Sequence, residues 1–317
     1  MKKILKIAIP LALGLLILFL LYRKTDFRAL WSDIQTANWL LLSVGVTFCL
    51  IANLMRGLRW ELLIRSLDYH PRRANILYAI MGNYAINFAI PRAGEIWRCS
   101  IIYQKDKIPL TKLVETLLID RISDVFMMAP IIVIAILLNI PVFSQHLHEF
   151  QAPDFLTSWQ LYVGLVIAAL IGVSALILFK DNWFVRKINT VISTMRKDVK
   201  ILLLMPHKTV FMLYSIGIWS CYIISFCFAC SAFAFTAHIG FAAILFVFVM
   251  GSISMMIPSN GGLGPWQAAT VFGLVAFAVN QEQAIAFATA TFTFQSLWLV
   301  LCGLFGIIML SATKDNG

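Results

Sequence analysis

Three short stretches of the sequence place arginines and carboxylates at helical spacing. They are RGLRW with Arg56 and Arg59, PRAGEIWR with Arg92, Glu95 and Arg98, and DRISD with Asp120, Arg121 and Asp124. Residues three or four apart share one face of a helix. Because a guanidinium holds a phosphate through a planar fork of N–H donors, Arg92 and Arg98 are candidate ligands of an anion. Glu95, Asp120 and Asp124 would then hold these arginines in place, or carry a proton or a cation.

The surroundings of these charges make them unusual. All three stretches lie beside or within apolar runs, and a charge at membrane depth normally faces a partner or an aqueous pathway. An alternative applies to the third stretch. If its helix enters the membrane near Ile122, Asp120 and Arg121 would be ordinary charges at the membrane interface.

A fourth stretch, SISMMIPSNGGLGPW over 252–266, interrupts an apolar run with prolines and glycines. In hydrocarbon, non-helical backbone is stable only where protein buries it or water reaches it, which predicts a polar cavity here. Pro265 suits the first turn of a returning helix, whose N-terminus favours a phosphate or a carboxylate. The alternative is a loop that merely turns between two short spans. The candidate ligand-binding residues of this stretch are Pro258, Asn260, Gly261, Gly262, Gly264 and Gln267.

The composition identifies the elements that must position these residues. Of the 317 residues, 61% are hydrophobic and only 13% are charged, which is far more apolar than a soluble domain. We therefore expect an all-α, polytopic membrane protein. A span needs about 20 apolar residues. On this criterion the full transmembrane helices are six, at about 4–22, 39–55, 113–140, 159–179, 209–237 and 283–311.

Two further apolar stretches, 75–101 and 241–280, are each broken near the middle. Lysine and arginine favour the cytoplasmic side of a membrane, and they are concentrated at the N-terminus and in 56–74 and 180–208. This pattern predicts cytoplasmic N- and C-termini. Alternation of the six spans then requires each broken stretch to enter and leave on one side. We expect two re-entrant helical hairpins.

The order of elements is the same in residues 1–157 and in residues 158–317. Each half reads span, span, hairpin, span, but the first starts inside the cell and the second outside. The hairpins share the short matches IPRAGE and IPSNGG, each preceded by a Met-Gly pair. These features predict an inverted repeat, in which interrupted segments at equivalent positions point to the binding site of a transporter.

The net charge of +10 lies mostly beside the predicted spans. This position argues against nucleic acid and for membrane phospholipids as partners. In 182–204, apolar residues recur at helical spacing with basic residues between them, which predicts a basic amphipathic helix at the interface. A linker helix that packs on the protein itself is the alternative.

The ordered combination of motifs resembles the lysylphosphatidylglycerol synthase transmembrane region family, also called the flippase-like domain. The likeness covers about 38–311 and implies a bacterial inner-membrane protein that moves an anionic or aminoacylated phosphatidylglycerol, or a related lipid-linked amphiphile, between leaflets. Two departures are Gln267, where the family often has Glu, and the polar residues around Gln295, where it often has Arg. The residues that match the motif positions are Arg59, Arg92, Gly94, Glu95, Arg98, Arg121, Asp124, Gly261, Gly262 and Gly264.

Three classes of function follow from these features. The first is a lipid flippase or transporter without catalytic activity, in which the two repeats rock against each other. The second is a membrane scaffold that recruits a soluble lipid-modifying enzyme through its basic face. We expect this chain to be the membrane module alone, without a soluble transferase domain, so such an enzyme would be a separate protein. The third is an integral membrane transferase with Asp120 or Asp124 as base. The sequence leaves homo-oligomerisation open.

Other chemistry has little support in the sequence. Cys227 and Cys230 form C-x-x-C inside an apolar span, where we expect small packing residues rather than a redox or metal pair. His146 and His148 beside Glu149 are expected to be solvated polar residues. No phosphate-binding P-loop and no nucleophile elbow is present. We expect neither a cofactor nor a metal.

Overall fold

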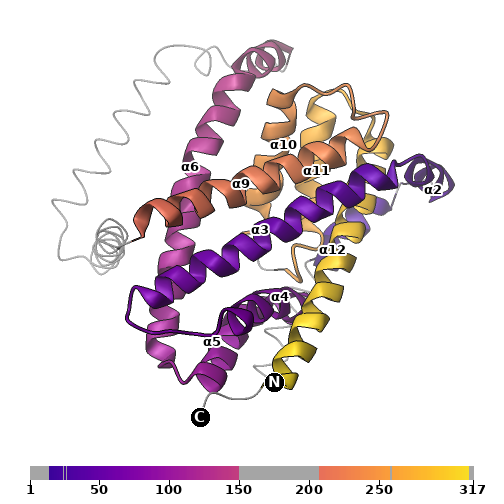
Figure 1. The fold of residues 1–317 in the computed structure, drawn as a ribbon. Coiled ribbons are helices and arrows are strands. Elements are labelled where there is room, and N and C mark those ends of the chain that lie inside the picture. The colour runs from indigo at the N-terminus through magenta and orange to yellow at the C-terminus, as the bar shows by residue number, and fades with distance from the viewer. Residues whose placement is uncertain (1–13, 24, 26, 150–206, 258, 314–317) are drawn as a thin grey trace, which may run out of the picture. The chain divides into compact units, whose positions relative to one another are not determined.

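The computed structural model describes residues 14–23, 25, 27–149, 207–257 and 259–313, with the backbone alone for 141–149. These residues form helices and turns without a β-strand, which confirms the all-α prediction. Residues 14–22 are helical. The other helices are α2 (Phe27–Gln35), α3 (Trp39–Arg65), α4 (Arg73–Ala89), α5 (Ala93–Asp106), α6 (Leu110–Glu149), α9 (Lys208–Ser231), α10 (Phe241–Ser254), α11 (Pro265–Ala276) and α12 (Gln281–Ala312) (Figure 1).

Four of the described helices, α3, α6, α9 and α12, are long and apolar enough to cross a membrane. They correspond to four of the six predicted spans. The predicted span at 4–22 is described only from residue 14, and the span at 159–179 and the amphipathic helix at 182–204 lie outside the described residues. The full number of spans therefore stays a prediction.

The helix α3 is ten residues longer than the predicted span at 39–55. It begins at an N-cap, Asn38, whose side-chain oxygen accepts hydrogen bonds from two backbone N–H groups of the first turn, and it continues to Arg65. A span read from apolar residues alone stops at the first charge, which is Arg56. The helix continues because its charged side chains find partners inside the protein. The helix α9, by contrast, ends earlier than predicted, at Ser231 instead of residue 237.

Two pairs of short helices occupy the predicted hairpin stretches. In each pair, α4 with α5 and α10 with α11, the two helices pack against each other. The longest of the four has 17 residues, which corresponds to about 26 Å at the rise of an α-helix. This is shorter than the hydrocarbon core of about 30 Å. The breaks lie where the sequence predicted them, while entry and return on one side of the membrane stay a prediction.

The two hairpins share a packing contact at equivalent positions. A Cβ atom built on Gly82 would lie 2.5 Å from the ring of Trp97, and one built on Gly251 would lie 2.9 Å from Nε1 of Trp266. In both hairpins the glycine is in the first helix, the tryptophan is in the second, and fifteen residues separate them. A glycine is required because the indole occupies the space of any side chain. Each glycine belongs to the Met-Gly pair that suggested the repeat.

The described residues within 1–135 and 206–317 form one compact unit, and α6 runs on from it into a second unit that begins at Ile136. In the first unit α3 packs along α9, and α4 packs along α12 (Figure 1). Gly303 and Gly306 of α12 permit the close approach to α4, since a Cβ atom on either would lie within 3 Å of α4 atoms. Small residues at such interfaces are typical of helices that pack inside membranes.

We expect Gly82→Ser to lower the stability of the protein by about 1–3 kcal/mol, because the new side chain overlaps the indole of Trp97. The thermal midpoint of the purified protein in detergent measures the effect. Gly240→Ser is the matched control, since no atom lies near a Cβ at that position and serine is a good N-cap for α10. Equal midpoints for the two variants would contradict the packing role of Gly82.

Candidate functional site

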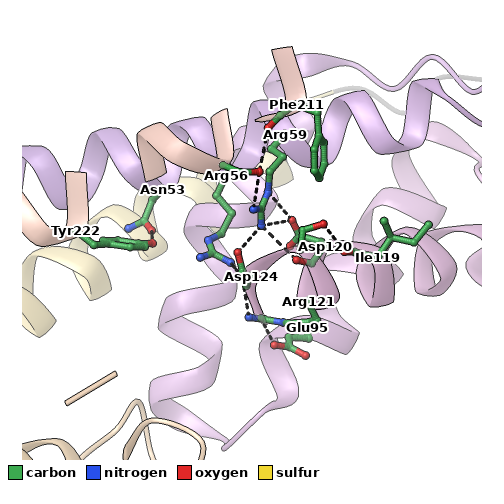
Figure 2. Close-up of polar contacts among 12 residues, drawn as sticks. Asn53, Arg56, Arg59, Glu95, Ile119, Asp120, Arg121, Asp124, Phe211 and Tyr222 are labelled. Carbon is green, nitrogen blue, oxygen red and sulfur yellow. Dashed lines mark hydrogen bonds and ion pairs between the residues drawn. The ribbon is translucent and has the colours of Figure 1, made fainter. Parts of the chain in front are cut away.

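Seven of the predicted site residues meet in one cluster between α3, α5 and α6. Figure 2 shows the side chains from α3 pointing toward those from α6. Every charged group of the cluster has at least one oppositely charged neighbour. The members are Arg56, Arg59, Glu95, Arg98, Asp120, Arg121 and Asp124.

Arg59 lies at the centre of this cluster and is fully buried. Its Nη2 donates to Asp120 Oδ1 at 2.6 Å and to Asp124 Oδ1 at 2.7 Å. Its Nη1 donates to Ser215 Oγ of α9 at 3.2 Å, and the ring of Phe211 lies 5.6 Å from its Cζ atom. Arg59 thus connects α3 to both α6 and α9.

Asp124 is shared between three arginines. Besides Arg59, its Oδ2 accepts from Arg56 Nη1 at 2.7 Å and lies 3.8 Å from Arg121 Nη1. Arg121 also pairs with Glu95 of α5. The side chains of Arg121 and Glu95 are 44% and 30% exposed, so this pair forms the accessible side of an otherwise buried cluster.

Arg98 is the least satisfied of the four arginines. Its side chain is 1% exposed, and its Nη2 lies 3.5 Å from Asp120 Oδ2. Its Nε has no hydrogen-bond partner among the described residues. The face of the guanidinium lies over the ring of Trp60 at 4.5 Å, and Trp60 Nε1 is itself held by Thr116 Oγ1 at 3.1 Å. Arg98 is thus positioned by stacking, with donors left over.

The charges of the cluster do not cancel. Four guanidinium groups face three carboxylates, which leaves one positive charge in excess. Asp120 lies ten residues into α6, about 15 Å along its axis, and it is fully buried. Asp120 is therefore shielded from solvent, whereas Arg121, the other residue of the interface alternative, is 44% exposed. A buried excess of positive charge favours an anion.

A polar contact that the sequence did not reveal adjoins the cluster. Asn53, three residues before Arg56 on α3, accepts hydrogen bonds at its Oδ1 from the hydroxyls of Tyr84 at 2.6 Å and Tyr222 at 2.7 Å. The ring of Tyr222 lies 5.9 Å from Cζ of Arg56. The spacing of Asn53 and Arg56 could have predicted that Asn53 lies on the same helical face as the cluster. The sequence gives no sign that the two tyrosines contact Asn53, since they lie on other helices, α4 and α9.

The structure gives Arg92 and Arg98 different neighbours, although both were predicted to bind one anion. Arg92 Nη2 donates to the main-chain carbonyl of Met256 at 2.7 Å. In the same region Asn260 Nδ2 donates to the carbonyls of Phe88 at 3.2 Å and Ala89 at 3.4 Å. The turn between α4 and α5 and the turn between α10 and α11 therefore contact each other. We call this contact the tip junction, and Arg92, Met256, Asn260, Phe88 and Ala89 form it.

The remaining predicted site residues shape the turns. Gly262 and Gly264 have φ angles of 92° and 91°, which favour glycine. Gln267 is buried, and its side-chain oxygen accepts from the backbone N–H of Gly264 at 2.7 Å, which caps α11. The backbone N–H of Gly94 is bound by Asn87 Oδ1 at 2.8 Å.

Gly261 and Pro258 are the last two of the predicted site residues. Gly261 has a φ of 61° and faces the ring of Phe88 across the tip junction. Pro258 lies outside the described residues.

The described residues hold no group of histidine, cysteine, aspartate or glutamate that could bind a metal. Cys227 and Cys230 lie in α9 as free thiols. The side chains of His146, His148 and Glu149 are outside the described part of the chain.

Comparison with known protein families matches residues 7–303 to the family described as the lysylphosphatidylglycerol synthase TM region. The chain belongs to this family. Comparisons with curated proteins and with solved structures gave no match. Membership of the lysylphosphatidylglycerol synthase TM region family, together with the four apolar helices, identifies a multi-pass membrane protein with a lipid-related function. The match covers all three charged stretches and the interrupted stretch at 252–266.

We expect Asp120→Asn to destabilise the protein by about 3–5 kcal/mol, because it leaves the buried guanidinium groups of Arg59 and Arg98 without their shared carboxylate. Thermal unfolding in detergent measures the loss. Glu115→Gln makes the same chemical change in the exposed pair with Lys112 and is expected to cost about 0–1 kcal/mol. If both variants have the same thermal midpoint as the wild type, Asp120 does not hold the cluster together.

Proposed function

We propose that this protein is a flippase that moves an anionic or aminoacylated phospholipid between leaflets and binds the headgroup at the charge cluster. The observation that carries the proposal is Arg98. It is a buried guanidinium with unused donors in a cluster that holds one excess positive charge. A phosphate would supply both the missing acceptors and the missing negative charge.

The mixed charge of the cluster suits an aminoacylated headgroup, which carries an ammonium as well as a phosphate. The phosphate would bind the donors of Arg98. The ammonium would compete with Arg121 for Glu95, since this pair is the exposed one. Asp120 and Asp124 would stay with Arg59 and hold the arginines in place. We assign no catalytic step and no cofactor to these residues.

The proposal includes the predicted architecture of six spans and two re-entrant hairpins, with both termini in the cytoplasm of a bacterial cell and the inner membrane as its location. The equivalent contacts of Gly82 with Trp97 and of Gly251 with Trp266 support two related halves. Rocking of the halves would expose the cluster to each side in turn. A separate lipid-modifying enzyme would supply the aminoacylated substrate, and membrane phospholipids are the binding partners.

Leaflet exchange of fluorescent phosphatidylglycerol in proteoliposomes tests this function. A membrane-impermeant bleaching reagent added outside destroys only the fluorescent lipid of the outer leaflet, which is about half of the total. With wild-type protein we expect more than this half to be bleached. We expect Arg98→Lys to slow the exchange by about 10- to 100-fold, because lysine keeps the charge but loses the planar fork of donors, a difference of about one charge-assisted hydrogen bond.

Arg65→Lys is the matched control for this experiment. It makes the same change at a position that is 44% exposed and pairs with Glu61, so exchange should stay at the wild-type rate. A lipid with an aminoacylated headgroup provides the second substrate. Bleaching that stops at the outer-leaflet half for both lipids, with folded wild-type protein, would contradict the flippase function.

A further inference from the structure

Each hairpin donates a side-chain hydrogen bond to backbone carbonyls of the other at the tip junction. The last carbonyl groups of a helix have no partner within the helix and need donors from elsewhere. At the end of α4 the carbonyls of Phe88 and Ala89 accept from Asn260 Nδ2, which belongs to the other hairpin. Two backbone groups of the first hairpin thus depend on a side chain of the second.

Arg92 makes the reciprocal contact. The helix α10 ends at Ser254, and the nearby carbonyl of Met256 accepts from Arg92 Nη2 at 2.7 Å. The guanidinium therefore lies at the C-terminal end of α10, where the helix dipole favours a positive charge. Both donors come from the short matches that relate the hairpins, IPRAGE and IPSNGG.

The base of the first hairpin is held in a different way. There the carboxylate of Asp106 accepts from Asn75 Nδ2 at 3.1 Å and from the backbone N–H of Arg72 at 3.3 Å. At the tip junction, by contrast, the acceptors of Arg92 and Asn260 are neutral carbonyls. An ionised acceptor forms a stronger hydrogen bond with a guanidinium than a neutral carbonyl does. A phosphate can thus take Arg92 from Met256.

Two further observations describe Arg92 itself. Its side chain is exposed, so it is open to an arriving anion. Its backbone has a φ of 59°, a left-handed conformation that a non-glycine residue rarely adopts and that is common in switch regions.

We propose that the tip junction is a gate that the phosphate of an anionic lipid headgroup, one without a cationic group of its own to offset it, opens by competing for Arg92. In the closed state Arg92 and Asn260 hold the ends of α4 and α10 together. When the phosphate binds Arg92, the carbonyl of Met256 just beyond α10 loses its donor, and Asn260 alone joins the hairpins. This inference rests on the proposed function, and it makes Arg92 a residue that senses the headgroup while Arg98 binds it.

Amide hydrogen exchange of the protein in lipid nanodiscs tests the gate directly. Asn260→Asp replaces the donor with a carboxylate that repels the carbonyls of Phe88 and Ala89. We expect the amides of both tips to exchange about tenfold faster, as the loss of one hydrogen bond of typical strength predicts. Asn280→Asp is the matched control, because aspartate also accepts from the backbone N–H of Glu282. Its exchange should equal that of the wild type.

Changing the lipid of the nanodisc tests the role of Arg92 separately from that of Asn260. In phosphatidylglycerol nanodiscs the wild-type tips should exchange faster than in phosphatidylcholine nanodiscs, and Arg92→Gln should abolish this difference. Inorganic phosphate added to phosphatidylcholine nanodiscs tells a lipid headgroup from a free anion as the opener, and only the lipid is expected to act. Equal exchange in both lipids would overturn the competition for Arg92. An effect of free phosphate as large as that of phosphatidylglycerol would overturn the lipid headgroup as the opener.

The leaflet-exchange assay keeps this inference distinct from the proposed function. Translocation by the wild type, with tip exchange unchanged in Asn260→Asp, would overturn the gate and leave the flippase function in place. Faster tip exchange in a protein that translocates neither lipid would overturn the flippase function and the gating role with it. Faster tip exchange together with an altered translocation rate in Asn260→Asp is the result we expect.

Discussion

A charge in hydrocarbon must have a partner, and the arrangement of α3, α5 and α6 follows from this constraint. Asp120 faces Arg59 on one side and Arg98 on the other. Removing any one helix would leave buried ions without counterions, which costs several kcal/mol. The cluster therefore fixes which faces of these helices meet, and apolar side chains alone would not do so, since lipid tails are as apolar as leucine. The same groups that hold the helices together leave Arg98 with unused donors.

Backbone groups impose the same requirement at the tips. A break in a helix frees carbonyl and N–H groups that lipid cannot satisfy. The structure satisfies them within the protein, through Asn260 and Arg92 across the tip junction and through Gln267 on α11. At Gln267, where the resemblance led us to expect Glu, the amide oxygen caps the helix without bringing a charge. At the other departure Gln295 donates to Cys49 Sγ at 3.2 Å.

Much of the fold could be predicted from the sequence, because apolar runs and their breaks are local signals. They located the four described helices that are long and apolar enough to span a membrane, and both pairs of short helices. The helical spacing of the charges placed Arg56 with Arg59 and Asp120 with Asp124 on shared helix faces. The partners of these groups could not be predicted, since the two residues of each contact are far apart along the chain. Arg59 and Asp120 are separated by 61 positions, and Asn53 and Tyr222 by 169. The end of α3 was missed for the same reason, because the partners that stabilise its charged segment lie on other helices.

The contact between glycine and tryptophan in each hairpin also bears on how the protein is made. Its two residues are only fifteen positions apart. The chain that joins them is short, so bringing them together costs little conformational entropy. It lies within one hairpin and needs no other span. The arms of a hairpin can therefore dock as soon as both have been synthesised, before α12 exists to cover α4. A pair of short helices that docks this early can insert into the membrane as one unit, while the carbonyls of Phe88 and Ala89 obtain their donor only once the second hairpin has been made.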